Sequence, residues 1–345
     1  QGLNVGGSSI TSLITMTEYY SQAEEPSTPA NGAVWWDGTD AYQYVGGAWR
    51  ILSVTAPPAW YGDTVVQPMG TYASSSLDTY NITTPANATN FGYSLTVARN
   101  SMGSCSDGSK GLFGGGRDGA AGESNVIDYI TFATPSNATD FGDLTVARGD
   151  GLGSCSNETY GLFAGGYRID TGYLYEIDYI TIATIGNATD FGDMTVGGWY
   201  TSGCGNETYG LFRGGASSTA SIEYVTIATP SNTTTFGDLT VARSFGVGAT
   251  SSRTRAVFGG GEDGSSVATN VIDYVTIATP ANATDFGDLT VARSSMAGAV
   301  SNGSRAVFTG GSTNTLDYVT IDTQGNATDF GDSTGTYGSA PCSGS

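Results

Sequence analysis

One short motif recurs along most of this 345-residue chain, and its spacing constrains the fold more than any other feature. A Phe-Gly pair marks each copy, and successive copies lie 44 to 50 residues apart. The marker phenylalanines are Phe91, Phe141, Phe191, Phe236, Phe286 and Phe330. Self-similarity at this period is typical of propellers and solenoids, in which each repeat is one supersecondary unit.

Each copy divides into four short strand-like segments separated by turn residues. In the last complete copy the segments are 294–301, 305–311, 315–323 and 329–335. Four antiparallel strands per repeat form the blade of a β-propeller. Residues 330–345 supply a fourth strand and a first strand, whereas 61–70 reads as a second strand with no first strand before it. We therefore predict an all-β, six-bladed propeller over residues 59–345, closed by a C-terminal strand that contains Cys342 and joins the first blade.

The repeats share further motifs. A double glycine follows the second strand, an Asp-Tyr pair lies on the third, an aromatic residue begins the fourth, and Ala-Arg leads into the next copy. Together these motifs resemble the kelch repeat, with Phe where kelch proteins usually have Trp. The resemblance covers residues 60–345 and implies a kelch-like propeller. It implies little about function, because propellers carry many activities.

The first 58 residues are different and contain three of the five tryptophans. Residues 26–52 resemble the short Pro/Gly/Trp modules of tailed-phage fibre proteins, and the repeat itself resembles virion-associated proteins of marine cyanobacterial phages. These resemblances imply a small β-rich attachment module at 1–58, ending in a Pro-containing linker at 55–59. They also imply contacts with other virion subunits through residues 1–58, an oligomeric assembly, and a virion or extracellular location.

Charge and hydropathy argue against two classes of partner. The chain has 32 acidic and 12 basic residues, a formal net charge of −20. Such a surface repels nucleic acid and anionic membranes. No apolar segment approaches the ~20 residues that a membrane-spanning helix needs. We therefore expect neither nucleic-acid binding nor membrane insertion.

The chain contains no histidine. This removes the Ser-His-Asp triad and the histidine-ligated copper and zinc sites. We predict a protein that is not an enzyme and has no cofactor. Acidity alone leaves Ca²⁺ open, although no complete calcium-loop motif occurs. A glycosidase needs only two carboxylates, so a polysaccharide-degrading enzyme of the tailspike kind remains an alternative.

Three kinds of repeated residue receive structural interpretations. The cysteines Cys105, Cys155, Cys204 and Cys342 hold equivalent positions in different blades, too far apart for disulfides, which predicts four free thiols. The third-strand acids Asp128, Asp178, Asp273, Asp317 and the variant Glu223 are expected to pair with arginines of the repeat. These arginines are Arg99, Arg148, Arg243 and Arg293.

Ten Asn-x-Ser/Thr sequons occur, and most of them fall in one kind of turn. They are Asn81, Asn87, Asn137, Asn157, Asn187, Asn206, Asn232, Asn282, Asn302 and Asn326. Asn-containing tripeptides make good turns, and copying a blade copies its sequon. Glycosylation is expected only if the chain passes through a eukaryotic secretory pathway.

Loops that connect the second and third strands, or one blade to the next, share the opposite face and vary most. Variable loops on a repeated scaffold often mediate recognition. One blade has a long loop at 167–176. The connection from this blade to the next, at 196–200, departs from the common sequence; we call such a connection between blades a crossing. The predicted ligand-binding residues are Tyr167, Arg168, Asp170, Tyr173, Tyr175, Trp199 and Tyr200. Aromatic rings beside hydrogen-bonding charges suit a sugar or a protein partner, although packing of the loop alone is an equally good interpretation.

These features favour a non-enzymatic virion structural protein, such as a phage fibre or appendage subunit. Its propeller would mediate binding to a host-surface glycan or to a protein partner. Two alternatives remain. One is a particle- or fibril-decorating subunit with ring-to-ring contacts, and the other is the polysaccharide-degrading enzyme.

Overall fold

The computed structural model divides the chain into two compact units, Gln1–Ala59 and Trp60–Ser345. In the first unit it describes residues 4–5, 8–9, 19–21, 33–36, 41–45 and 48–52. In the second it describes 62–68, 74–119, 122–215, 219–294, 297–311, 313–335 and 341–344. The predicted linker at 55–59 lies outside the described residues.

The first unit contains two small sheets. Strands β1 (Asn4–Val5) and β2 (Ser8–Ser9) form an antiparallel ribbon. A four-stranded sheet has the order β3 (Tyr19–Ser21), β4 (Val34–Trp36), β5 (Ala41–Val45) and β6 (Ala48–Leu52). Its first pair is parallel and the others are antiparallel.

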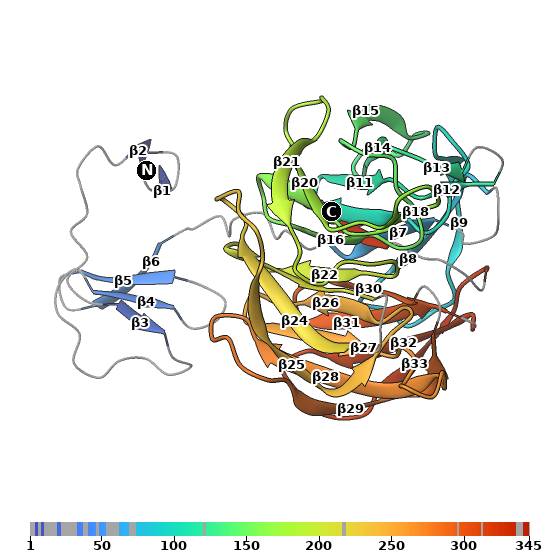
Figure 1. Ribbon diagram of the computed structural model, residues 1–345. Helices are drawn as coiled ribbons and strands as arrows, with labels where there is room; N and C mark the ends of the chain where they lie inside the picture. The colour runs from blue at the N-terminus through green and yellow to red at the C-terminus, as the bar shows by residue number, and fades with distance from the viewer. Residues whose placement is uncertain are drawn as a thin grey trace. The chain divides into compact units, whose positions relative to one another are not determined.

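The second unit is a six-bladed β-propeller, as predicted (Figure 1). Each blade is a four-stranded antiparallel sheet, with its first strand innermost and its fourth strand outermost. Blade 1 is β34 (Cys342–Gly344), β7 (Thr64–Pro68), β8 (Ser76–Asn81) and β9 (Thr89–Ser94). Blade 2 is β10 (Gly103–Ser106), β11 (Lys110–Gly114), β14 (Val126–Thr131) and β15 (Thr139–Asp143). Blade 3 is β16 (Gly153–Ser156), β17 (Tyr160–Ala164), β20 (Glu176–Thr181) and β21 (Thr189–Asp193).

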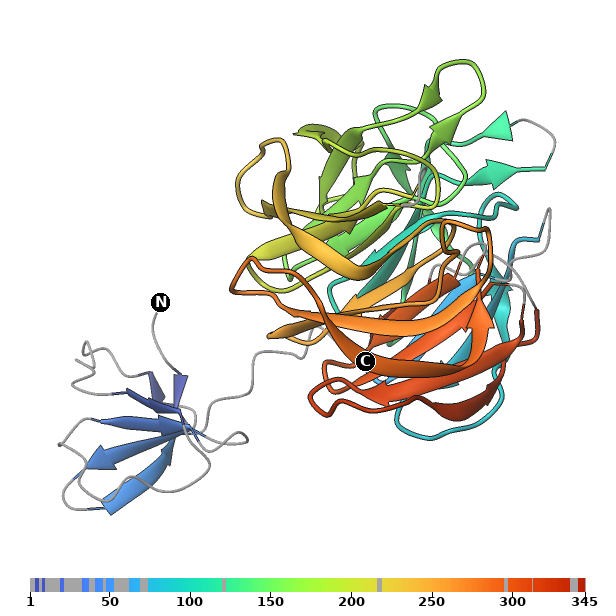
Figure 2. The same ribbon diagram turned by 60° about the horizontal axis from the view of Figure 1, so that its bottom comes forward.

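The remaining three blades repeat this order around the ring (Figure 2). Blade 4 is β22 (Ser202–Gly205), β23 (Tyr209–Arg213), β24 (Thr219–Thr226) and β25 (Thr234–Arg243). Blade 5 is β26 (Gly248–Ser251), β27 (Arg255–Gly259), β28 (Thr269–Thr276) and β29 (Thr284–Arg293). Blade 6 is β30 (Ala297–Ser301), β31 (Arg305–Gly310), β32 (Thr315–Thr320) and β33 (Thr328–Asp332).

The ring closes through its C-terminal strand. Cys342 pairs with Val66, and Gly344 pairs with Thr64, so β34 supplies the innermost strand that the N-terminal end of blade 1 lacks. Closure leaves every sheet flanked by two others, which protects the short blade edges. The predicted closure is confirmed.

Apolar side chains fill the spaces between blades because the repeated glycines let neighbouring sheets approach. A Cβ at Gly114 would lie 2.8 Å from the ring of Phe163, and a Cβ at Gly259 would lie 2.7 Å from the ring of Phe308. Both phenylalanines are fully buried. Burying such a ring stabilises the fold by roughly 1.5–3 kcal/mol. The Gly-Phe pairing therefore explains why the second strand repeats so closely.

Four arginines and four acids of the repeat form buried ion pairs, as predicted. Each arginine ends the fourth strand of one blade or follows it in the crossing, and its partner lies on the third strand of the next blade. The pairs are Arg99–Asp128, Arg148–Asp178, Arg243–Asp273 and Arg293–Asp317, and all eight side chains are fully buried. The guanidinium of Arg99 also donates to the carbonyls of Gly115 and Val126, so the charge is well satisfied.

Blades 1 and 4 lack this pair. Asp78 and Glu223 hold the acid position there, and both are buried, but neither forms a salt bridge among the described residues. The equivalent of the arginine is Gly198 in blade 4. The Glu223 carboxylate instead accepts hydrogen bonds from the Thr195 backbone N–H at 3.0 Å and the Thr233 hydroxyl at 2.7 Å.

The sequon asparagines of the turns between third and fourth strands connect neighbouring blades. In each case the Oδ1 atom accepts from a backbone N–H of the preceding blade, over 3.0–3.2 Å. The six pairs are Asn87–Asp332, Asn137–Ser94, Asn187–Asp143, Asn232–Asp193, Asn282–Asp238 and Asn326–Asp288. These contacts give the repeated Asn-Ala-Thr sequence a structural role that needs no glycan.

The innermost strands surround a central channel that contains a nearly continuous ring of serine hydroxyls. Each hydroxyl donates to a carbonyl of the preceding blade; Ser106 reaches Ser343 at 2.7 Å, and Ser156 reaches Ser106 at 2.7 Å. Ser251, Ser301 and Ser343 continue the series. Gly205 occupies the sixth position and has no hydroxyl with which to continue it.

Candidate functional site

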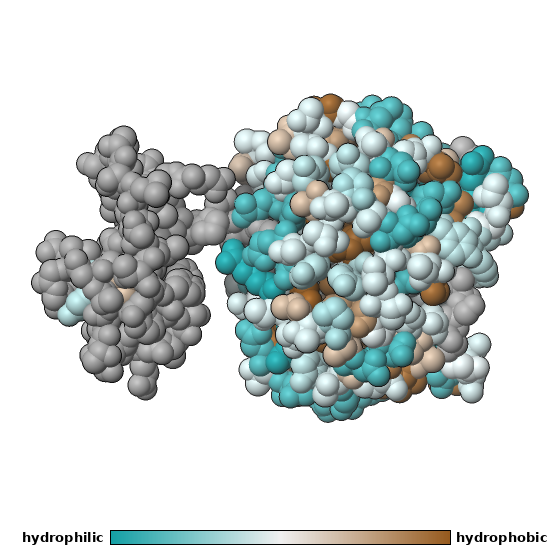
Figure 3. Space-filling model, turned by 60° about the vertical axis from the view of Figure 1, so that its left-hand side comes forward, coloured by the Kyte–Doolittle hydropathy of each residue, from teal (hydrophilic) through white to brown (hydrophobic). Residues whose placement is uncertain are grey.

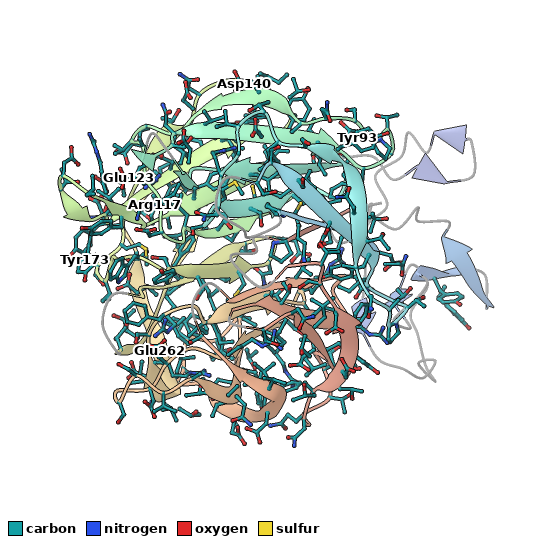
Figure 4. All side chains as sticks on the ribbon, turned by 90° about the vertical axis from the view of Figure 1, so that its right-hand side faces the viewer. Tyr93, Arg117, Glu123, Asp140, Tyr173 and Glu262 are labelled. Atoms are coloured by element: carbon teal, nitrogen blue, oxygen red, sulfur yellow. The ribbon has the colours of Figure 1, made fainter. Side chains whose placement is uncertain are left out.

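Two small hairpins lie in the loops between the second and third strands of blades 2 and 3. Strands β12 (Arg117–Asp118) and β13 (Gly122–Glu123) form the hairpin of blade 2, and β18 (Tyr167–Arg168) and β19 (Gly172–Tyr173) form that of blade 3. The two hairpins touch, since Glu123 Oε1 accepts from the Ile169 N–H at 3.2 Å. Figure 4 shows Arg117, Glu123 and Tyr173 along one edge of the propeller, with Tyr93 toward the opposite edge.

Five aromatic rings gather beside the hairpin of blade 3. Trp199 is central, with ring centroids 5.2 Å from Tyr167, 6.0 Å from Tyr173, 5.7 Å from Tyr200 and 5.8 Å from Phe245. Tyr200 and Phe245 also contact each other, at 5.5 Å. We call these five residues the aromatic cluster. Tyr173 is exposed and the other four rings are half-buried, so the cluster presents ring surface to solvent.

The backbone of the crossings holds two of these rings in place. Tyr200 has a φ of 53° and Phe245 a φ of 47°, the left-handed region that costs an aromatic residue about 1–2 kcal/mol. The equivalent Ser101 and Asp150 share this conformation, each with a φ of 56°, so the strain belongs to the fold. The crossings into blades 4 and 5 differ in that they place a large aromatic side chain, Tyr200 or Phe245, at this position.

In the crossing into blade 4, Gly198 replaces the repeated arginine. A Cβ at Gly214 would overlap the Val196 carbonyl, and a Cβ at Gly215 would overlap the Trp199 and Tyr200 carbonyls. The crossing therefore packs directly on the double glycine of blade 4. Trp199 follows Gly198, whereas a small residue follows the arginine in the other copies.

The structure brings together four of the seven predicted ligand-binding residues: Tyr167, Tyr173, Trp199 and Tyr200. Tyr175 makes no ring contact with them in the described part of the chain; its ring packs against Gly197. Arg168 and Asp170 lie on the same hairpin and form an exposed ion pair at 2.8 Å. Such a pair contributes little to stability and leaves both groups accessible.

Sequence reasoning missed Phe245. Its signal was present, because residues 244–245 read Ser-Phe where the crossing into blade 2 reads Asn-Ser. Asp150 was also missed. Its backbone carbonyl accepts from the Tyr200 N–H at 2.6 Å, and its carboxylate pairs with Arg117 at 3.1 Å.

Burial raises the pKa of the Asp150 carboxyl; Arg117 opposes this shift and Glu123 reinforces it. Asp150 and Glu123 are thus two interacting acids near the aromatic cluster. A raised carboxyl pKa beside a second acid is compatible with general acid chemistry, and it also occurs at structural sites.

The four cysteines are free, as predicted, and all four are buried. Three of them point at glycines of the following blade, because a Cβ at Gly111, Gly161 or Gly210 would lie 2.5–2.6 Å from a cysteine sulfur. Burial raises the pKa of each thiol. Thiols in such surroundings remain protonated and unreactive. Among the described residues no cluster of three or more His, Cys, Asp or Glu side chains is arranged to hold a metal ion.

No protein-family model matches the chain, and no curated protein matches it significantly in sequence. The six-bladed propeller therefore rests on the structure, whereas the kelch and phage resemblances remain predictions. The part of the chain that the structure describes includes no helix with the length and apolar character needed to cross a membrane.

Proposed function

We propose that the propeller is a non-enzymatic recognition module that binds a neutral glycan through the aromatic cluster, in a phage fibre or appendage subunit. The cluster itself is the observation that carries the proposal. Most second-to-third-strand loops are short and polar, whereas the cluster places ring faces at the surface, where a sugar ring can stack. The formal net charge of −20 favours a neutral glycan over an acidic one.

Polar groups beside the rings support the same ligand class. Arg168 and Asp170 are 39% and 55% exposed, so both can exchange their mutual ion pair for hydrogen bonds to sugar hydroxyls. Arg117 lies on the neighbouring hairpin and is 36% exposed. Flat rings with exposed donors and acceptors at their margin are the usual composition of a sugar-binding surface.

Glycan-array binding and calorimetry test this proposal. We expect Tyr173→Ala and Trp199→Ala each to weaken binding of the recognised glycan about tenfold or more, because each removes a stacking surface worth roughly 1.4 kcal/mol. Tyr93→Ala is the matched control, since Tyr93 is also an exposed aromatic but lies toward the opposite edge. Equal losses in the control variant, or wild-type protein that binds no glycan, would count against the proposal.

A second function, lateral contact between subunits, is favoured by one other observation. Val97, Val241 and Val291 occupy equivalent places after the fourth-strand motif and are 36%, 41% and 41% exposed. On the face shown in Figure 3, hydrophobic residues lie scattered among hydrophilic ones. A Val241→Ser/Val291→Ser variant that assembles normally would remove this alternative.

The enzymatic alternative depends on Asp150 and Glu123. It predicts release of reducing ends from a host polysaccharide and loss of that release in Asp150→Asn. Under our proposal the wild-type protein releases none.

A further inference from the structure

The interface of blades 4 and 5 contains an arginine that the repeat does not explain. In three other blades the inner two strands pair two small residues at this place: Gly103 with Gly114, Gly153 with Ala164, and Gly248 with Gly259. In blade 4 the pair is Ser202 with Arg213. Because the small residues face the next blade, the Arg213 side chain enters the space between blades 4 and 5.

Arg213 is fully buried, and among the described residues it has one hydrogen bond, from its Nη2 to the Thr219 carbonyl at 3.1 Å. Its Nε and Nη1 have no hydrogen-bond partner among the described residues. The Nε atoms of the four crossing arginines also lack a partner, but each of those arginines forms an ion pair with a buried carboxylate. Arg213 forms none in the described part of the chain.

The charge of Arg213 is therefore unbalanced. The charged side chain that perturbs the pKa of Arg213 is Arg243, which is itself paired with Asp273. Burial, reinforced by Arg243, lowers the pKa of Arg213 to about 9, so the side chain still has its proton at neutral pH. The propeller residues outside the described set include no aspartate or glutamate that could supply the missing charge.

A second orphaned donor lies on the adjacent strand. Ser202 is buried, and its Oγ has no hydrogen-bond partner among the described residues. Ser202 also lines a cavity of about 80 Å³ at the channel, together with Thr201 and Val247. The cavity reaches Ser202, the strand partner of Arg213, whereas Arg213 itself does not line it.

We propose that a small inorganic anion of the halide class binds between blades 4 and 5, held by Arg213 and Ser202. A halide accepts hydrogen bonds from both side chains and balances the buried charge, whereas a water molecule would only do the former. The burial of Arg213 favours a single-atom anion over phosphate or a carboxylic acid.

The test is thermal unfolding of the full chain in sodium chloride against sodium gluconate at equal ionic strength. Gluconate is too large for the site. We expect chloride to raise the Tm of the wild type by about 3–5 °C with a saturating dependence on concentration. Arg213→Gly, which restores the residue found in blades 2 and 5, should abolish the response, and Ser202→Gly should weaken it. Arg253→Ala removes an exposed arginine and should leave the response unchanged.

A wild-type Tm that is the same in both salts, or a full chloride response in Arg213→Gly, would overturn the proposal. If Arg213→Gly does not fold, crystals of the wild type in bromide decide the question. An anomalous peak within hydrogen-bond distance of Arg213 Nη1 or Nε and Ser202 Oγ supports the site. A water molecule there, or bromide peaks on the surface only, refutes it.

Discussion

Blades 3 and 4 are neighbours whose inner two strands have the same lengths, yet their buried acids are satisfied in different ways. In blade 3 a buried acid, Asp178, is matched by Arg148 from the crossing. In blade 4 the acid is Glu223, the crossing contains Gly198, and threonines satisfy the carboxylate. The loss of the crossing arginine accompanies the placement of Trp199 at the surface. In blade 4 an aromatic cluster therefore lies beside a crossing that has no structural ion pair.

The largest expected effect comes from breaking the pair in blade 3. Arg148→Met leaves the fully buried Asp178 carboxylate without its cation, and we expect a loss of about 3–5 kcal/mol in the free energy of unfolding, measured in urea. Arg148→Met combined with Asp178→Leu removes both charges and should recover most of that loss. A single variant that costs less than about 1 kcal/mol would mean that the pair does not hold the blade.

A smaller effect should follow in blade 4. Glu223→Gln keeps an oxygen that can accept from the Thr195 N–H or the Thr233 hydroxyl, so we expect a loss of about 1–2 kcal/mol. Asp178→Asn is the counterpart in blade 3 and leaves Arg148 unbalanced, which should cost about 3–5 kcal/mol. Equal costs for the two substitutions in parallel urea titrations would erase the difference between the blades.

The smallest effect depends on pH. In gluconate buffer at pH 7 we expect Arg213→Met to be more stable than the wild type by about 1 kcal/mol, because it removes an unbalanced buried charge. The pKa of Arg213 falls to about 9 on folding, so the unfolded chain holds this proton more tightly. The wild type should therefore gain stability relative to Arg213→Met as the pH rises above 9.

This third comparison is measured as urea midpoints of both proteins at pH 7 and pH 10. A difference that stays constant between the two pH values would show that Arg213 keeps its proton in the folded state at pH 10, so that folding does not lower its pKa to about 9.

Much of the fold could be predicted because the same blade sequence recurs along the chain. The Phe-Gly period indicated the blades, and the incomplete units at the two ends of the ring indicated closure through Cys342. The ion pairs were predictable because Arg and Asp recur together in the same copies. The candidate site was only partly predictable. Tyr167 and Trp199 stood out as departures from the repeat, but the contact of Trp199 with Phe245 depends on where two crossings lie in space.

Arg213 shows why departures from a repeat are hard to interpret from sequence alone. Its position was visible in the sequence, but burial and the absence of a carboxylate partner among the described residues emerge only from the packing of two blades. Asp150 was missed for a similar reason, since its partner Arg117 comes from the hairpin of another blade.

The pairing of residues 342–344 with residues 64–66 also affects how the protein is made. Translation at roughly 5–20 residues per second separates the synthesis of these two segments by roughly 15–60 s. During that interval the ribosome-bound chain has an unpaired strand edge at 64–66, which can pair with residues 342–344 of a chain that is completed on a neighbouring ribosome. Crowding of ribosomes on one message should therefore raise the yield of strand-exchanged dimers.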